Sequence, residues 1–144
     1  MANIEASAIG EGALIEHLER RRWEAIFSAG MALLHVREID LLIGDLRESM
    51  VYWRDQEIDA LLRVTMAGSV SIGARDEDVN YFLNIAAENL IRVGKIRERL
   101  STVLVYLEDA EAQKQLLLFE RSEARMEINN LGNRIFNIRH PFSG

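Results

Sequence analysis

The chain has 144 residues, of which 49% are hydrophobic and 28% charged, with a net charge of -6, one proline and no cysteine. This length predicts a single domain, and the apolar content excludes an intrinsically disordered chain. Without cysteine there is no disulfide scaffold, no zinc–cysteine site and no cysteine nucleophile. The acidic balance opposes binding to a phosphate backbone, so we expect no nucleic-acid partner.

The first residues lack the basic and apolar regions of a signal peptide. No run of residues is apolar and long enough to span a membrane, which takes about 20 residues. The uncharged run of residues 25–36 is short and includes serine, glycine and histidine. We therefore expect a cytoplasmic protein without membrane insertion.

An apolar stripe with helical spacing covers most of the first half of the chain. From Ile15 to Ala67 the stripe advances by alternating steps of three and four residues, and fourteen of its sixteen positions are apolar. Only Arg22 and Glu57 interrupt it. Seven-residue spacing sustained over this length is typical of a seam between packed helices. The pattern predicts a helix over residues 13–67.

The best turn candidate follows directly, from Gly68 to Gly73, with two glycines and two serines in six residues. Three acidic residues come next, at positions 76–78. Acidic side chains favour the start of a helix, because they cap free N–H groups and oppose the helix dipole. We therefore expect a turn over 68–73 and a second helix over 77–138.

A second apolar stripe runs from Val79 to Leu107 and is interrupted only by Arg97. It uses Leu83, Ala86, Leu90, Val93, Leu100 and Leu104. The pattern resumes at Leu117 after a single short step, which predicts a stammer in the seam or a helix break near Asp109. Strong helix formers around that residue favour a continuous helix.

Many apolar residues flank the first stripe and also need cover. They are Ile26, Phe27, Leu33, Leu34, Leu41, Leu42, Val51, Tyr52, Leu61 and Leu62. A face this wide belongs in a bundle of at least three or four helices. The sequence therefore predicts an all-α fold, in which a long antiparallel helical hairpin packs as a four-helix bundle by dimerisation.

The alternative is a monomeric four-helix bundle, in which the two arms break near residues 37–45 and 97–113. The absence of proline from both arms favours the dimer. In either case we expect one helical domain over 1–144, with short flexible ends at 1–11 and 139–144.

No catalytic or cofactor motif is complete. None of the three histidines has a glutamate three residues before it, so the Glu-x-x-His motif of di-iron bundles is absent. The glycine spacing of a phosphate loop occurs at 68–73, but Ala74 and Arg75 follow where lysine and a hydroxyl residue belong. We therefore expect no enzyme activity, no metal and no cofactor.

Several apolar residues are candidates for contact with a partner. They are Trp23, Tyr52, Trp53, Val70, Ile72 and Phe142. Aromatic residues are enriched at protein interfaces. The predicted function is a non-enzymatic protein-interaction module (an adaptor, a chaperone-like protein or a regulatory subunit) that acts through amphipathic helices. Its partner is another protein, a second copy, or both.

An alternative function follows from the two arginines on the apolar stripes. A charge at such a position can pair across the bundle, fix the register of the helices, or bind an anion. The alternative is thus a four-helix-bundle sensor or enzyme that binds a small anionic ligand through Arg22 and Arg97.

Overall fold

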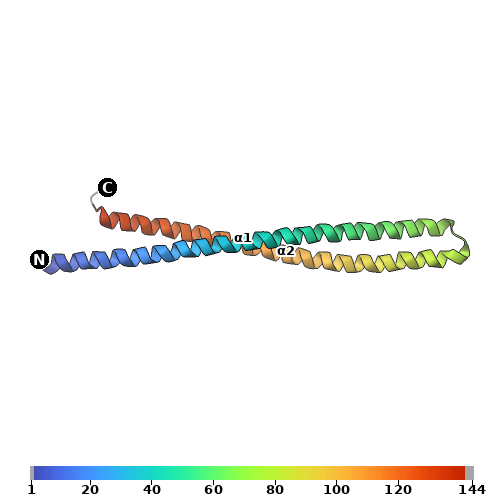
Figure 1. Ribbon diagram of the computed structural model, residues 1–144, viewed down its shortest axis with the longest axis horizontal. Coiled ribbons are helices and arrows are strands. Elements are labelled where there is room, and N and C mark those ends of the chain that lie inside the picture. The colour runs from blue at the N-terminus through green and yellow to red at the C-terminus, as the bar shows by residue number, and fades with distance from the viewer. Residues whose placement is uncertain (1, 142–144) are drawn as a thin grey trace. The chain divides into compact units, whose positions relative to one another are not determined.

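In the computed structural model the chain folds as two long α-helices that pack against each other as a hairpin (Figure 1). The structure describes residues 2–141, with side chains from residue 10 onward. Helix α1 spans Ala2–Gly73 and helix α2 spans Asp76–Arg139. No strand occurs within residues 2–141. The predicted all-α helical hairpin is confirmed.

The turn and the start of the first helix were placed wrongly by the sequence pattern. Helix α1 begins at Ala2 rather than near residue 13, and it continues through the predicted turn to Gly73. Neither glycine of that segment has a positive φ, so both continue the helix. The Ser71 hydroxyl donates a hydrogen bond to the Gly68 carbonyl at 2.7 Å, which fits serine into the last helical turn. The connection therefore shrinks to residues 74–75.

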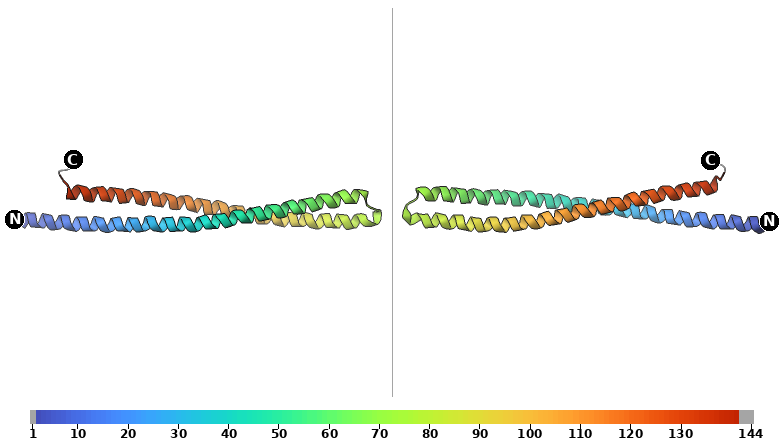
Figure 2. Two further views of the ribbon diagram at one scale, coloured as in Figure 1. Left: turned by 45° about the horizontal axis from the view of Figure 1, so that its top comes forward. Right: turned by 180° about the vertical axis from the view of Figure 1, so that it is seen from behind.

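Helix α2 is continuous and has its three acidic residues in its first turn, as the sequence predicts. Neither arm breaks near 37–45 or 97–113, and the two helices are unbroken in each view of Figure 2. The monomeric four-helix bundle is therefore wrong. The physical reason is that both segments lack proline and are rich in good helix formers.

The hairpin divides into two compact units. The terminal unit combines Met1–Asp40 with Ala112–Gly144, and the loop unit is Leu41–Glu111. In the terminal unit a core cluster joins Leu18 to Leu131 and Ile135, with Ile15 and Ile138 packed against it. In the loop unit a second cluster joins Ala60 to Val93 and Ile96, with Trp53 and Leu100 packed against it. Each unit is thus a pair of helices closed along one narrow seam.

The first apolar stripe is the seam of α1. Fifteen of its sixteen positions are buried or partly buried, and only Arg22 is exposed. Five of the twelve buried apolar residues among those described are alanines. Small side chains allow the helix axes to approach closely, but they bury little apolar surface.

The second stripe follows the seam of α2 at Val79, Ala86, Val93, Leu100 and Leu107, but its other four positions lie beside the seam. Leu83, Leu90 and Leu104 are 49%, 54% and 44% exposed, whereas Ile96 and Ala110 are 3% exposed. The seam of α2 advances by regular steps of three and four from Val79 to Ile138, through Phe82, Ala86, Asn89, Val93, Ile96, Leu100, Val103, Leu107, Ala110, Lys114, Leu117, Arg121, Ala124, Ile128, Leu131 and Ile135. No phase shift occurs, so the predicted stammer is wrong. The seam of α2 includes polar and small residues, while three leucines lie beside it.

Candidate interaction surfaces

The two charged residues that interrupt the apolar stripes within the loop unit bind each other. Arg97 Nε donates to Glu57 Oε2 at 3.2 Å. The side chain of Glu57 is 25% exposed and that of Arg97 is 63% exposed, so water screens the pair. An exposed ion pair contributes about 0–1 kcal/mol. Since Arg97 already holds a carboxylate of its own chain, an external anion would have to compete with Glu57.

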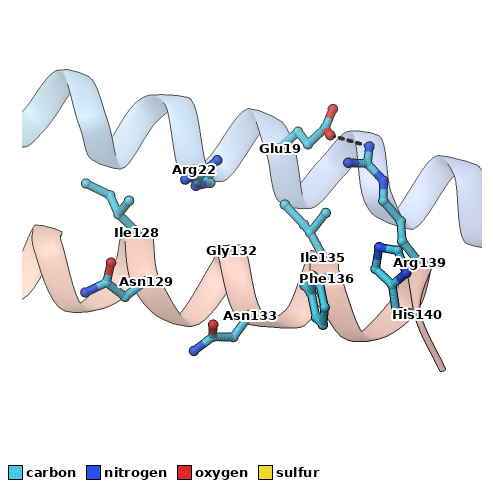
Figure 3. A pocket seen from close by; sticks show the side chains of 10 residues that line it. All are labelled: Glu19, Arg22, Ile128, Asn129, Gly132, Asn133, Ile135, Phe136, Arg139 and His140. Atoms are coloured by element: carbon cyan, nitrogen blue, oxygen red, sulfur yellow. Dashed lines mark hydrogen bonds and ion pairs between the residues drawn. The ribbon is translucent and has the colours of Figure 1, made fainter. Parts of the chain in front are cut away.

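Arg22 has a different environment, in the terminal unit. No hydrogen bond or ion pair joins its side chain to another residue of the described part of the chain. The side chain lies against Gly132 of α2, and a Cβ at that glycine would be 3.6 Å from Nε and 3.8 Å from Cζ (Figure 3). These are ordinary van der Waals distances, so the guanidinium group of Arg22 lies beside the α2 backbone at this glycine.

A groove of about 690 Å³ surrounds this arginine. Its lining residues are Glu19, Arg22, Ile128, Asn129, Gly132, Asn133, Ile135, Phe136, Arg139 and His140 (Figure 3). Arg139 donates to Glu19 at 2.6 Å, and the rings of Phe136 and His140 lie 4.5 Å apart. A guanidinium group in such a groove can bind a carboxylate or a phosphate. The structure places Arg22 and Arg97 in different units, and this groove belongs to Arg22 alone.

Polar contacts between the two helices lie on both edges of the seam. In the loop unit, Arg47 pairs with Glu111 at 3.3 Å on one edge, and Arg92 donates to Gln56 on the other. Leu61 follows Arg47 by two heptads, and Leu104 precedes Glu111 by one. Residues a whole number of heptads apart share a helix face. Leu61 and Leu104 therefore lie on the same edge as the Arg47–Glu111 pair.

We call this edge of the loop unit the leucine edge. It consists of Leu61, Leu83, Leu90 and Leu104, which are 36%, 49%, 54% and 44% exposed. The last three come from the stripe that the sequence assigned to the seam. Arg97 occupies the same heptad position between Leu90 and Leu104 and is paired with Glu57, so the leucines flank one arginine on this edge. Exposed leucines beside a closed seam are of the kind that a further helix covers in a bundle.

A second apolar surface lies on α1 in the terminal unit, and we call it the Trp23 face. It consists of Trp23, Ile26, Phe27, Leu33 and Leu34, which are 70%, 37%, 69%, 48% and 55% exposed. Gly30 lies in the middle of the face, with open space where a Cβ would be. No charged residue occurs from 25 to 36. The sequence identified Trp23 as a candidate, and the helix adds the four aliphatic and aromatic neighbours.

The other residues predicted to contact a partner have different environments. Tyr52 is 55% exposed and meets the Trp53 ring edge-on at 5.0 Å. Trp53 packs against the loop-unit core, with Arg99 4.8 Å above its ring. Val70 and Ile72 are 48% and 89% exposed, in the last turns of α1 rather than in a loop. Phe142 lies outside the described residues.

Within the described residues, no group of three histidine, aspartate or glutamate side chains could hold a metal ion. Neither helix has, in its described residues, a stretch long and apolar enough to cross a bilayer. No protein-family model, curated protein or solved structure matches the chain.

Proposed function

We propose that this protein is a non-enzymatic interaction module that binds an amphipathic helix of a protein partner along the leucine edge. The single observation that carries the proposal is the exposure of four leucines on one edge of the loop unit. A partner helix with apolar residues at three- and four-residue spacing would fit such a strip. The module would serve as a cytoplasmic adaptor, chaperone-like protein or regulatory subunit.

The hydrophobic effect favours binding of a partner helix to the leucine edge. Complete burial of one leucine stabilises by about 1.5–3 kcal/mol, and half of that gain remains available at a half-exposed side chain. Since the seam is rich in alanine, the hairpin itself gains little from its core. A covering helix would therefore add stability as well as affinity.

We also infer that two hairpins associate as a homodimer that forms a four-helix bundle. The chain exposes 10980 Å² of solvent-accessible surface. A compact monomer of 16.4 kDa exposes about 7500 Å², so the hairpin leaves about 3500 Å² of surplus surface. A stable interface buries about 1600 Å² in total, and the surplus is more than enough for it.

Substitutions on and off the leucine edge test partner binding. Leu90→Glu with Leu104→Glu places charge on the edge. The matched control is Ile91→Glu with Val105→Glu, on the same helix at residues that are each 62% exposed. In capture from native lysate followed by cross-linking and mass spectrometry, we expect cross-links to the edge that the first variant loses and the control keeps. Equal capture by both variants, or cross-links elsewhere only, would contradict the proposal.

A second candidate function rests on the unpaired Arg22 above Gly132. A small carboxylate or phosphate would accept hydrogen bonds from the guanidinium group in the groove of the terminal unit. Titration with inorganic phosphate and with succinate, followed by amide chemical shifts, is expected to move the signals of Asn129 and Asn133. The Arg22→Gln variant should lose these shifts. Shifts that persist in this variant would exclude Arg22 as the anion-binding residue.

A further inference from the structure

We propose that the terminal unit binds an acidic amphipathic helix of a protein partner along one edge of its seam, which we call the arginine edge. The edge consists of Arg22, Ile26, Leu33, Arg121 and Arg125. This inference rests on the second candidate function and deepens it, because it specifies that the carboxylate bound by Arg22 belongs to a helix. It is independent of the leucine edge, which lies in the loop unit.

The Glu19–Arg139 ion pair crosses the seam on this edge and sets the register of the two helices there. Ile26 lies one heptad further along α1, and Gly132 lies one heptad back along α2. Because the helices are antiparallel and residues a heptad apart share a face, Ile26 lies level with Gly132. The side chain of Arg22 rests against this glycine and supplies a positive charge at the same level (Figure 3).

The next heptad along each helix places Leu33 of α1 level with Arg125 of α2. Arg121 lies one helical turn before Arg125, and both line a second groove of about 280 Å³. The lining residues of this groove are Leu118, Arg121, Ser122, Arg125, Met126 and Asn129. Asn129 also lines the groove around Arg22, so the two grooves adjoin.

The three arginines of the edge have no carboxylate of their own. No hydrogen bond or ion pair joins the side chains of Arg22, Arg121 or Arg125 to another described residue. Among the described residues that line the two grooves, Glu19 is the single carboxylate, and Arg139 already pairs with it at 2.6 Å (Figure 3). The arginine edge is therefore positively charged, although the chain has a net charge of -6.

The carboxylates of the same stretch of α2 lie on the opposite edge. Glu19 and Arg21 are two residues apart, which is about 200° around α1, so Arg21 points away from the arginine edge. Arg21 pairs with Glu127 at 3.1 Å. The groove beside this pair also includes Glu120 and Glu123. Acidic and basic side chains of α2 are thus separated instead of paired, and the free positive edge is complementary to an acidic partner.

The length of the edge and its apolar side favour a helix over a small anion or a nucleic acid. Gly132 and Arg121 are eleven residues apart, which is about 16 Å along α2. Ile26 and Leu33 are 37% and 48% exposed beside the arginines, and a phosphate backbone has no apolar group to cover them. A helix with one apolar row would cover both side chains. Carboxylates seven residues apart on its neighbouring row would match Arg125 and the arginine at Gly132.

Synthetic helical peptides test the charge of the partner. The acidic peptide has leucine at the apolar heptad positions and glutamate at one flanking position of each heptad, and the matched peptide has glutamine at the flanking positions. In fluorescence anisotropy with the full chain, we expect the acidic peptide to bind about tenfold more tightly. The difference should shrink at 1 M salt. Equal binding of the two peptides, or no binding of either, would overturn the proposal.

Two arginine variants test the position of the site on α2. Arg125 and Arg134 are both exposed, and neither has a hydrogen bond or an ion pair with another described residue. Arg134 lines the groove on the opposite edge. Arg125→Gln should weaken binding of the acidic peptide about threefold, whereas Arg134→Gln should leave it unchanged. Equal weakening by the two variants would indicate general attraction to positive charge and would overturn the arginine edge.

Two leucine variants distinguish the arginine edge from the rest of the Trp23 face. Leu33 and Leu34 are adjacent and are 48% and 55% exposed. Successive residues point about 100° apart, and Leu33 is the one that lies a whole number of heptads from Glu19. Leu33→Gln should weaken peptide binding about fivefold, and Leu34→Gln should leave it unchanged. Weakening by Leu34→Gln alone would overturn the proposed position of the partner helix.

Titration with small anions separates this inference from the second candidate function. Phosphate or succinate shifts that depend on Arg22, combined with negative peptide results, overturn the acidic helix alone. Absence of both overturns the anion site and the acidic helix together. A single-stranded oligonucleotide that binds through Arg125 more tightly than the acidic peptide would assign the edge to nucleic acid and overturn the proposal. Circular dichroism of each variant shows whether it retains its helices.

Discussion

Arg97 of α2 donates to Glu57 of α1 at 3.2 Å, so the two charges that interrupt the apolar stripes of the loop unit neutralise each other. Glu57 is a charged residue at a seam position of α1, whereas Arg97 lies beside the seam of α2 and is 63% exposed. The pair favours one register of the two helices, since a shift of one heptad would separate the two side chains. Such a pair across the helices specifies their alignment more than it adds stability.

A double-mutant cycle on this pair measures the coupling directly. Because Glu57 and Arg97 are both partly exposed, we expect Glu57→Gln and Arg97→Gln to show a coupling energy of about 0.5 kcal/mol in urea denaturation. The coupling should fall at 1 M salt, where screening is strong. A coupling energy of zero at low salt would mean that the contact does not persist in solution.

Ala60 tests the close approach of the helices in the loop unit. It is fully buried and packs against Val93 and Ile96. Ala60→Leu should lower the free energy of unfolding by about 1–3 kcal/mol, because the seam has no room for the larger side chain. The control Ala87→Leu, at an exposed position of the same unit, should change it by less than about 0.5 kcal/mol. Similar effects of the two substitutions would contradict the placement of Ala60 in a closely packed seam.

Asn89 is the polar residue that most clearly misdirects a sequence-based assignment of α2. It is partly buried at a seam position, and its Nδ2 donates to the Ile85 carbonyl at 2.8 Å within the helix. Asn89→Leu should raise the free energy of unfolding by about 1 kcal/mol, because an apolar side chain then fills the seam. Asn84→Leu, at an exposed position, serves as the control. Destabilisation by Asn89→Leu would show that the seam at this level depends on the amide.

The sequence predicted the hairpin and the seam of α1 well, because that stripe combines apolar residues with unbroken heptad spacing. It placed only alternate positions of the α2 seam correctly, and the reason is physical. Leu83, Leu90 and Leu104 are more hydrophobic than the seam residues Asn89 and Ala110, so hydrophobicity alone favoured the wrong edge. Only contacts with the other helix distinguish the two edges, since both have the same spacing.

The sequence pattern also failed to predict the helix boundaries. Two glycines and two serines predicted a turn at residues 68–73, yet the segment stays helical because continuing the hydrogen bonds of α1 outweighs weak local propensity. For the candidate surfaces, Trp23 stood out as an aromatic residue, while the leucine edge did not. Its leucines were interpreted as core, and their exposure became visible only with the correct register.

The molar mass of the full chain in solution tests the central claim most directly. Sedimentation equilibrium over a wide concentration range should give a species of twice the chain mass of 16.4 kDa. A chain that keeps the mass of a single copy at every concentration would contradict the homodimeric four-helix bundle.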